Sequence, residues 1–474
     1  MKNINYDIVI IGGGAAGLTC AKLAKGMGKK VLLIEKNNIG GECTWTGCIP
    51  SKTLIHVANS IHDAESLEKI GINLIRSIDS ENIMRHVRST IQAVYERETE
   101  QDLEKIGIDV LKGTAYFLDG TTIMCSGIKI TTKKCIIATG SSPFIPPIDG
   151  LDSVSYLTNQ TIFALKKLPK SMIIVGGGPI GVELASALNR LSVKITIVES
   201  FSRILAKEDK ELVAILSKQL VKEGIQINNE TQAIKVAQEQ NAILLTCTNK
   251  TGEKTIQAES LLIAVGRQPN INELDLAKAG VQYTQKGIVV SSTLQTTAHS
   301  IYACGDVVGP YQFSHIAHYQ ATIATRNALI PFFKKRINYE NIAWVTFTDP
   351  ELAHAGLTEE QALKRYGGTI KMYRSNLATL DRAVTDGKTI GLAKFICDKN
   401  NKILGAQILG PRAGELIHEI QIGKKLNTHF QNYFFTIHAY PTYSELIWQA
   451  SKTCYIEKLQ NNFFIKCIKK ILQF

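Results

Sequence analysis

Two cysteines, Cys43 and Cys48, lie five residues apart in the segment 40–52, soon after a glycine-rich loop. Five residues rise roughly 7.5 Å along a helix axis, whereas a disulfide needs its Cα atoms within about 7 Å. The two thiols therefore cannot bridge across a regular helix, and we expect the backbone over 44–47 to be looped. Pro50 suits the first turn of a helix, which places Cys48 at a helix N-terminus. The helix dipole favours a thiolate there, so this spacing is typical of a redox-active pair.

The sequence before the cysteines is typical of a dinucleotide-binding loop. An apolar strand over 6–11 runs into G-x-G-x-x-G, whose glycines are Gly12, Gly14 and Gly17. These glycines allow a tight turn, a close approach of a pyrophosphate, and close packing of the helix on the strand. Glu35 ends the next apolar strand, where its carboxylate can accept a hydrogen bond from a ribose hydroxyl.

A second fingerprint follows at 172–183, with Gly176, Gly178 and Gly181 at the glycine positions. Two dinucleotide loops imply two nucleotide ligands, FAD and a nicotinamide. Glu199 ends the next strand after the second loop. A carboxylate at this point accepts from a ribose 2′-hydroxyl and repels a 2′-phosphate, so the sequence predicts that NADH is preferred over NADPH.

With these motifs, the chain resembles the class I pyridine nucleotide–disulfide oxidoreductases, which include dihydrolipoamide dehydrogenase, glutathione reductase and mercuric reductase. The resemblance covers nearly the whole chain and implies an α/β fold. Two Rossmann-like domains would bind FAD and NAD(P), and an α+β dimerisation domain would follow. Further motifs of the family are two interdomain crossovers at 138–140 and 264–267, a second flavin motif at 301–306, and the start of the dimerisation domain at 345–351.

The resemblance also implies a division into domains. We expect a discontinuous FAD-binding domain over 1–143 and 268–336, an NAD-binding domain over 144–267, and a dimerisation domain over 337–457. A basic tail over 458–474 has apolar residues at helical spacing. This amphipathic tail either packs on the protein's own surface or lies on an anionic membrane.

Roles for individual residues follow from the same resemblance. It implies that electrons pass from the nicotinamide through FAD to the disulfide, with Cys48 against the flavin and Cys43 exchanging with the substrate. Lys52, one helical turn after Cys48, would pair with Glu183 beside the flavin, and Asp306 would hold FAD. His315 would lie at a helix N-terminus near the flavin, or is simply packed. The other predicted cofactor contacts are Ala115, Thr139, Gly140, Gly266 and Arg267.

The predicted substrate base departs from the family. Dihydrolipoamide dehydrogenases and glutathione reductases carry His-Pro-Thr-x-x-Glu, whose histidine is the base for the dithiol and reaches the partner subunit's disulfide. Here Tyr440 holds the histidine position, as in mercuric reductase, and Glu445 keeps the glutamate. A phenol with a pKa of about 10 is a poor base at neutral pH. His438, two residues earlier, is either a substitute base or a packed side chain.

Two other differences from the family pattern mean that the sequence does not identify the substrate. Trp45 stands between the redox cysteines, where smaller residues are usual, and would narrow the approach to Cys43. Mercuric reductases end in a vicinal cysteine pair, whereas Cys454 and Cys467 lie thirteen residues apart here.

Composition bounds the remaining functions. A chain of 474 residues predicts two or three domains, with no apolar run or leader that indicates a membrane span or secretion. The ten cysteines are too sparse for a disulfide scaffold, which fits a reducing cytoplasm. The net charge of +12 is interpreted as a lysine-rich surface and not as a nucleic-acid face. No zinc-ligand spacing is present.

The sequence therefore predicts a cytoplasmic, homodimeric flavin disulfide oxidoreductase that uses FAD and prefers NADH. Its acceptor would be a thiol, a metal ion or another small molecule, with no resident metal and no nucleic-acid partner. One alternative is a flavoprotein electron-transfer component held peripherally on the inner face of a membrane through 458–474. A second alternative is a true dihydrolipoamide dehydrogenase.

Overall fold

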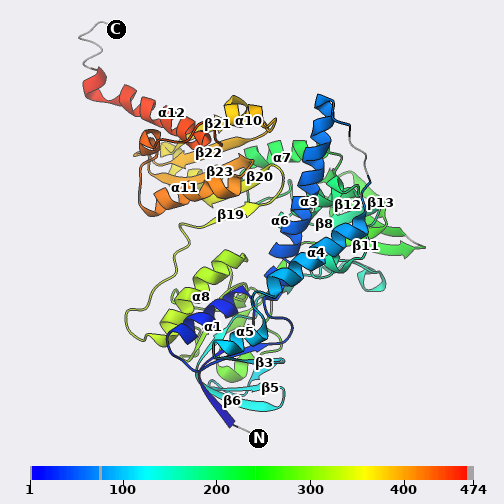
Figure 1. Cartoon of the computed structure of the whole chain (residues 1–474), viewed down its shortest axis with the longest axis vertical. Helices are drawn as coiled ribbons and strands as arrows, with labels where there is room; N and C mark the ends of the chain where they lie inside the picture. The colour runs from blue at the N-terminus through cyan, green and yellow to red at the C-terminus, as the bar shows by residue number, and fades with distance from the viewer. Residues whose placement is uncertain (1–2, 74–76, 241, 467–474) are drawn as a thin grey trace. The chain divides into compact units, whose positions relative to one another are not determined.

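The computed structural model describes residues 3–73, 77–240 and 242–466 (Figure 1). The chain divides into two compact units, and the division falls inside the second glycine loop. Unit 1 comprises Met1–Gly176, Ala233–Thr248 and Glu253–Asn338, and unit 2 comprises Gly177–Gln232, Asn249–Gly252 and Tyr339–Phe474.

In its described residues, unit 1 is built on a seven-stranded sheet in the order β3-β2-β1-β6-β5-β4, with β18 also paired to β6. Strands β1, β2, β3, β6 and β18 pair in parallel with one another, whereas β5 pairs antiparallel with both β6 and β4. The strand bounds are β1 (Asn3–Ile11), β2 (Val31–Glu35), β3 (Ile108–Lys112), β4 (Ala115–Phe117), β5 (Thr122–Cys125), β6 (Ile128–Ile137) and β18 (Ile301–Ala303).

Both faces of this sheet are covered, which explains the continuous apolar runs in its parallel strands. Ile8 and Ile10 of β1 face one core, whereas Val9 and Ile11 face another, as the alternation of a strand requires. Helices α1 (Ala15–Gly26) and α8 (Ser314–Leu329) lie side by side against the first core (Figure 1). Alanines recur along α8 at helical spacing on this side, so the two helices can approach closely.

The helices that follow the first loop carry the cysteine segment. Helix α2 (Gly41–Trp45) is followed at once by α3 (Cys48–Ser66), which packs alongside α4 (Ser80–Tyr95). Asp79 caps α4 by accepting from the backbone N–H groups of Glu81 and Asn82. Helix α5 (Glu100–Lys105) begins with a capping box between Thr99 and Asp102.

Four smaller groups of paired strands complete the described part of unit 1 and its borders. The antiparallel pair β7 (Ser141–Pro143) and β15 (Arg267–Pro269) brings together the two segments predicted to be interdomain crossovers. Strand β8 (Ser171–Val175) pairs in parallel with β14 (Ser260–Ile263), and β16 (Tyr283–Thr284) pairs with β17 (Gly287–Ile288). A three-stranded sheet has the order β11-β12-β13, with bounds Gln232–Glu239, Ala242–Asn249 and Gly252–Ala258.

Unit 2 begins with the helix of the second glycine loop. Helix α6 (Pro179–Arg190) leads into β9 (Lys194–Val198), α7 (Lys210–Lys222) and β10 (Gln226–Asn228), and β9 pairs in parallel with β10. The rest of the described unit is an antiparallel sheet in the order β19-β20-β23-β22-β21, with α11 packed on β20 and β23 and α12 on β21. Its elements are β19 (Ala343–Thr346), β20 (Glu351–Gly356), α9 (Glu359–Tyr366), β21 (Lys371–Asn376), α10 (Asp381–Thr385), β22 (Leu392–Cys397), β23 (Ile403–Gly410), α11 (Ala413–Lys425) and α12 (Glu445–Asn461).

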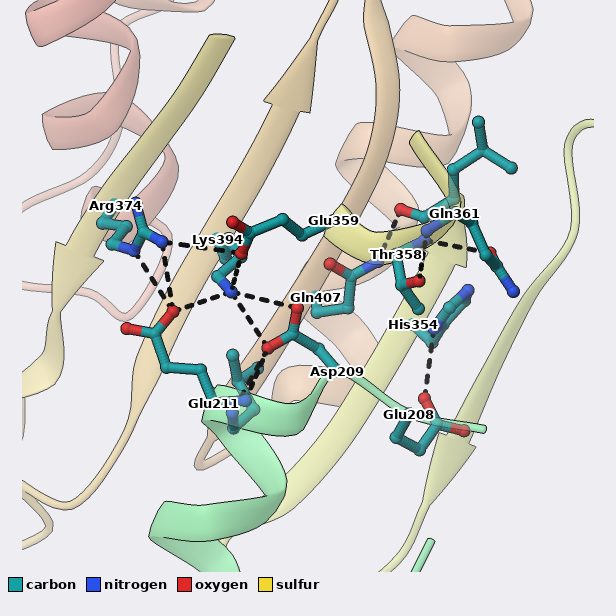
Figure 2. A network of polar contacts seen from close by, with 12 residues as sticks. Glu208, Asp209, Glu211, His354, Thr358, Glu359, Gln361, Arg374, Lys394 and Gln407 are labelled. Carbon is teal, nitrogen blue, oxygen red and sulfur yellow. Dashed lines mark hydrogen bonds and ion pairs between the residues drawn. The ribbon is translucent and has the colours of Figure 1, made fainter. Parts of the chain in front are cut away.

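A buried lysine joins the two parts of unit 2 (Figure 2). Lys394 of β22 is fully buried, and its ammonium group contacts Asp209 at 3.0 Å, Glu211 at 2.7 Å and Glu359 at 2.7 Å. Beside it, His354 of β20 contacts the Glu208 carboxylate at 3.1 Å. These contacts anchor the segment after Glu199 to the antiparallel sheet.

The predicted tail at 458–474 is partly described. Helix α12 continues to Asn461, past residue 458, and Phe463 and Phe464 beyond it are 73% and 75% exposed. The remaining apolar positions of the predicted stripe lie in 467–474, outside the described residues. Across the described ranges, the helices are all too short or too polar to cross a bilayer.

Candidate functional site

The two cysteines predicted to be redox-active lie on consecutive helices. Cys43 lies in α2, and Cys48 is the first residue of α3, as predicted. The predicted break in the backbone is found at 46–47, but the prediction of a loop over 44–45 is wrong, because α2 continues through them. A Cβ on Gly47 would lie 2.8 Å from a carbonyl oxygen of α2, so the tight turn between the helices requires glycine.

Electrostatic contacts distinguish the two thiols. Both are partly buried, and the hydrogen bond to Cys48, followed by burial, raises the pKa of Cys43 well above its ordinary value. Ser314 Oγ lies 3.5 Å from Cys48 Sγ, and a side-chain hydrogen bond with Ser314 also offsets part of the rise in the pKa of Cys43. Ser314 is the first residue of α8, whose N-terminus has no side-chain cap. Cys48 therefore lies at one helix N-terminus and beside another, where helix dipoles favour negative charge, whereas Cys43 tends to keep its proton.

The first glycine loop has the geometry of a nucleotide turn. Gly12 has φ = 109°, which favours glycine. A Cβ on Gly17 would lie 1.7 Å from the Gly12 carbonyl oxygen, so α1 can pack on the turn only with glycine there. The Glu35 carboxylate accepts from Gly13 N at 2.5 Å and from Asn37 N at 2.7 Å. This places a fixed carboxylate beside the loop.

The surroundings of this loop fit a bound dinucleotide. Gly14 precedes α1 without a side-chain cap, so the first N–H groups of the helix are available to a pyrophosphate. A Cβ on Gly41 would lie 2.6 Å from Gly14 Cα, so only glycines let these two loops approach so closely. Thr46 Oγ1, between the redox cysteines, is buried with no partner among the described residues. Burial raises the pKa of Asp306 in the second flavin motif, although Ser141 Oγ donates to it at 2.7 Å.

The second glycine loop repeats the first. Gly176 has φ = 111°, and a Cβ there would lie 2.4 Å from a carbonyl oxygen of its crossover segment, against 2.3 Å at Gly12. Glu199 accepts from Gly177 N at 2.6 Å and from Phe201 N at 2.8 Å, the same arrangement as Glu35. The two loops are therefore equivalent nucleotide turns.

The start of α6 and the segment after Glu199 complete the second turn. Gly178 precedes α6 without a side-chain cap, and Gly181 is buried in the first turn of the helix. Arg203, four residues after Glu199, donates to the carbonyl oxygens of Ala206 at 2.9 Å and Glu208 at 3.4 Å. This arginine is therefore held by the backbone.

The crossover residues predicted to contact cofactors occupy the segments around β7 and β15. Thr139 Oγ1 donates to the Asn270 carbonyl oxygen at 2.8 Å. Gly140 and Gly266 have φ values of 71° and 137°, with open space where a side chain would be. Arg267 Nε donates to Ser141 Oγ at 2.7 Å. The structure brings these residues together, and their predicted contacts with the cofactors stay a prediction.

The other predicted residues are distributed over both units. Ala115 is buried at the start of β4, and the His315 ring stacks on Phe313 with centroids 5.5 Å apart. Lys52 lies one turn after Cys48 on α3. Glu183 is buried on α6, and its Oε1 accepts from Phe347 N at 2.9 Å. The pairing of Lys52 in unit 1 with Glu183 in unit 2 stays a prediction.

The predicted substrate-base region lies in unit 2. Tyr440 donates its hydroxyl hydrogen to Asp381 Oδ2 at 2.6 Å, and this hydrogen bond raises the pKa of the phenol. His438 contacts Glu419 Oε1 at 3.1 Å and a backbone carbonyl oxygen at 2.9 Å. Glu445 Oε2 is buried without a partner among the described residues. The phenol is thus held protonated, and both nitrogens of the histidine are occupied.

Sequence reasoning missed three side chains of this site, although two of them adjoin predicted residues. Ser314 precedes His315, and Glu42 precedes Cys43. The sequence shows that both lie next to predicted site residues, but no local pattern indicates that Ser314 contacts Cys48. Asp381 lies in a distant segment and carried no signal of its contact with Tyr440.

Comparisons with known proteins agree with this geometry. The family model described as pyridine nucleotide-disulphide oxidoreductase matches residues 6–321, and its dimerisation domain matches 342–451. The chain is 33% identical over 452 residues to a mercuric reductase of Lysinibacillus sphaericus, covering 95% of this chain and 82% of that protein. It is 32% identical over 456 residues to a dihydrolipoyl dehydrogenase of Geobacillus stearothermophilus, covering 95% and 96%.

Solved structures give the same result. The chain superposes on the HOCl-induced flavoprotein disulfide reductase RclA from Escherichia coli with a TM-score of 0.85 and 29% identity, covering 94% of this chain and 99% of that one. A Cu(II) complex of RclA superposes with the same TM-score at 28% identity, covering 96% and 100%.

The fold and the site define a two-nucleotide flavoprotein with a redox-active cysteine pair. The chain belongs to the pyridine nucleotide–disulfide oxidoreductase family. It is an FAD-dependent enzyme that uses a pyridine nucleotide, and the dimerisation domain supports a homodimer. The predicted fold class, family and enzyme class are confirmed.

Proposed function

We propose that this enzyme passes electrons from NADH through FAD to the Cys43–Cys48 pair and then to a thiophilic metal ion or a similarly small acceptor. The observation that favours this acceptor over a dithiol is the hydrogen bonding of the two side chains at the predicted substrate-base position. Tyr440 is hydrogen-bonded to Asp381, and His438 is engaged at both ring nitrogens. A dithiol such as dihydrolipoamide needs a base to become nucleophilic, and neither side chain is suited to that role.

The chain's own residues would stabilise the negative charge on one reduced cysteine and keep the other cysteine protonated. When bound, FAD would accept a hydride from the nicotinamide and supply two electrons to the disulfide. The S–S bond breaks, and Cys48 holds the negative charge with support from Ser314 and the N-termini of α3 and α8. Cys43, whose raised pKa keeps it protonated, is then the thiol that meets the acceptor.

A thiophilic metal ion fits this pair without a separate base. Soft metal ions bind cysteine sulfur as the thiolate, so binding to a protonated thiol displaces its proton directly. Two Cu(II) ions would each gain one electron and become Cu(I), the Cys43–Cys48 disulfide would form again, and the one proton held by Cys43 would be released. The relatives named mercuric reductase and the Cu(II) complex of RclA support metal ions of this class as acceptors.

NADH is the proposed electron donor. Glu199 presents a fixed carboxylate beside the second loop, and it would accept from a ribose 2′-hydroxyl and repel a 2′-phosphate. Arg203 is bonded to backbone oxygens, so it is not poised to offset that repulsion.

We also propose the domain boundaries that the resemblance implied, with FAD held by 1–143 and 268–336, the nicotinamide by 144–267, and the dimer formed by 337–457. The proposed location is the cytoplasm. The alternative of a membrane-associated electron-transfer component is supported by two exposed phenylalanines, Phe463 and Phe464, in a basic segment. The absence of a suited base makes a true dihydrolipoamide dehydrogenase the weaker second candidate.

Steady-state turnover of the FAD-loaded enzyme tests the proposal. NADH oxidation should depend on added Cu(II), and Cys43→Ser should abolish it. Dihydrolipoamide with NAD⁺ should be turned over slowly. Fast dihydrolipoamide turnover, or Cu(II)-dependent NADH oxidation that survives Cys43→Ser, would refute the proposed acceptor. A large increase on adding membranes would instead favour the electron-transfer alternative.

A further inference from the structure

A chain of polar contacts runs from the residue next to Cys43 to Asp306, and no role has been given to its first member, Glu42. Glu42 precedes Cys43 on α2, and its carboxylate forms an ion pair with Arg267. The other carboxylate oxygen accepts from Gln160 Nε2 at 2.6 Å. The side chains of Glu42 and Arg267 are only 28% and 13% exposed, so solvent screens this pair less than a pair on the open surface.

Arg267 continues the chain toward the second flavin motif. Its guanidinium donates to Ser141 Oγ at 2.7 Å and to the Ser141 carbonyl oxygen at 2.8 Å. Ser141 Oγ in turn donates to Asp306 Oδ2 at 2.7 Å, and Arg267 Nε lies 3.7 Å from the same oxygen. One guanidinium thus bridges the carboxylate next to Cys43 and the carboxylate predicted to hold FAD.

The helix that carries Cys43 depends on such contacts. An α-helix as short as α2, with five residues, is not stable by itself, so its position is set by what holds its ends. At its C-terminal end, Trp45 Nε1 donates to the Ile39 carbonyl oxygen at 2.8 Å. The Trp45 ring also packs on Tyr95 of α4, with centroids 5.0 Å apart. At its N-terminal end, the side-chain tether is Glu42.

We propose that Glu42 is a positioning residue for Cys43, whose ion pair with Arg267 fixes the orientation of α2 and links it, through Ser141, to the flavin motif at Asp306. This inference rests on the proposed role of Cys43 as the cysteine that meets the acceptor. Loss of the Glu42 carboxylate would release the N-terminal end of α2 while leaving both thiols in place. Reactions of Cys43 would then slow, whereas hydride transfer from NADH, which precedes them, would not.

The test uses Glu42→Gln in the FAD-loaded full chain, because glutamine keeps the size of the side chain and removes its charge. Stopped-flow absorbance separates reduction by NADH from reoxidation by Cu(II). We expect reoxidation to slow by about tenfold, equivalent to about 1.4 kcal/mol, with reduction by NADH unchanged. Alkylation of Cys43 by iodoacetamide in the reduced enzyme, followed by peptide mass spectrometry, should slow in parallel. Glu273→Gln, which neutralises an exposed partner of Lys36, is the matched control and should change neither rate.

Further variants decide between a positioning role and a general structural one. The double variant Glu42→Gln/Arg267→Gln is compared with the two single variants. If the ion pair acts as a unit, Cys43 in the double variant should be alkylated no more slowly than in the slower of the two single variants. Additive losses, or unchanged alkylation in Glu42→Gln, would overturn the proposal.

If Glu42→Gln does not retain FAD, Glu42→Asp and Gln160→Ala replace it. Glu42→Asp shortens the tether, whereas Gln160→Ala leaves the ion pair intact, so the proposal requires the first to be slower and is overturned by the reverse order. Normal Cu(II) turnover in Cys43→Ser would refute the proposed function itself, whatever the behaviour of the Glu42 variants.

Discussion

The choice of nicotinamide is the sharpest consequence of the second glycine loop. Glu199 is buried and fixed by hydrogen bonds from Gly177 N, Phe201 N and Ser200 Oγ, at 2.6, 2.8 and 3.2 Å. The carboxylate therefore cannot swing away from an incoming 2′-phosphate. We predict that NADH is preferred over NADPH, and that Glu199→Gln reduces this preference by improving the use of NADPH.

The size of the preference follows from the charges. At about 4 Å, two unit charges repel by about 1 kcal/mol in water and by about 4 kcal/mol near a protein surface. A phosphate monoester carries between about 1.5 and 2 negative charges, and the fixed Glu199 carboxylate gives the protein no way to relax the contact. Even the repulsion in water, multiplied by about 1.5 charges, disfavours NADPH by at least about 1.4 kcal/mol. That difference corresponds to about tenfold in kcat/KM.

The assay is kcat/KM for NADH and NADPH with the same acceptor and FAD-loaded enzyme. The native ratio should be at least about tenfold in favour of NADH, and Glu199→Gln should lower it mainly by raising kcat/KM for NADPH. Glu230→Gln, which neutralises an exposed carboxylate paired with Lys250, is the control and should leave the ratio unchanged. Equal efficiencies of the native enzyme with the two nucleotides would refute the reasoning.

Four other results are expected. Reduction of the FAD-loaded enzyme should give a long-wavelength charge-transfer absorbance that survives Cys43→Ser and is lost in Cys48→Ser; the reverse pattern would exchange the roles of the two thiols. Ser314→Ala should weaken that absorbance at a given pH, because a hydrogen bond to a charged group is worth about 1.5–3 kcal/mol, and an unchanged band would exclude this support. Steady-state assays should show slow native turnover of dihydrolipoamide and glutathione disulfide, which Tyr440→His should raise modestly for dihydrolipoamide; fast native turnover of either would show that another group acts as base. In co-sedimentation with anionic vesicles, the full chain and a chain ending at Glu457 should bind equally weakly, whereas tail-dependent binding would favour the membrane interpretation.

The parts of the site that were predictable from sequence depend on local rules. Gly12 and Gly176 could be assigned because a nucleotide turn needs a positive φ and leaves no room for a side chain. Cys48 could be placed at a helix N-terminus because Pro50 follows it at a position that suits the first turn. Each of these predictions needed only residues within one or two turns of each other.

The parts that were not predictable depend on contacts between distant segments. Ser314 contacts Cys48 across 266 residues of sequence, and Arg267 pairs with Glu42 across 225. The Tyr440 partner, Asp381, is 59 residues away. The loop over 44–47 was predicted because a disulfide between Cys43 and Cys48 cannot span a regular helix, yet α2 includes residues 44 and 45. A five-residue helix has little intrinsic stability, so its conformation comes from tertiary contacts that no local pattern encodes.

An anaerobic thiol count on the FAD-loaded enzyme tests the central claim most directly. After reduction by NADH, alkylation with mass spectrometry should find Cys43 and Cys48 newly reactive, and treatment with Cu(II) before alkylation should return both to the disulfide with formation of Cu(I). If NADH reduces the flavin while Cys43 and Cys48 remain disulfide-bonded, or if Cu(II) reoxidises the flavin without forming that disulfide again, the proposed electron route is wrong.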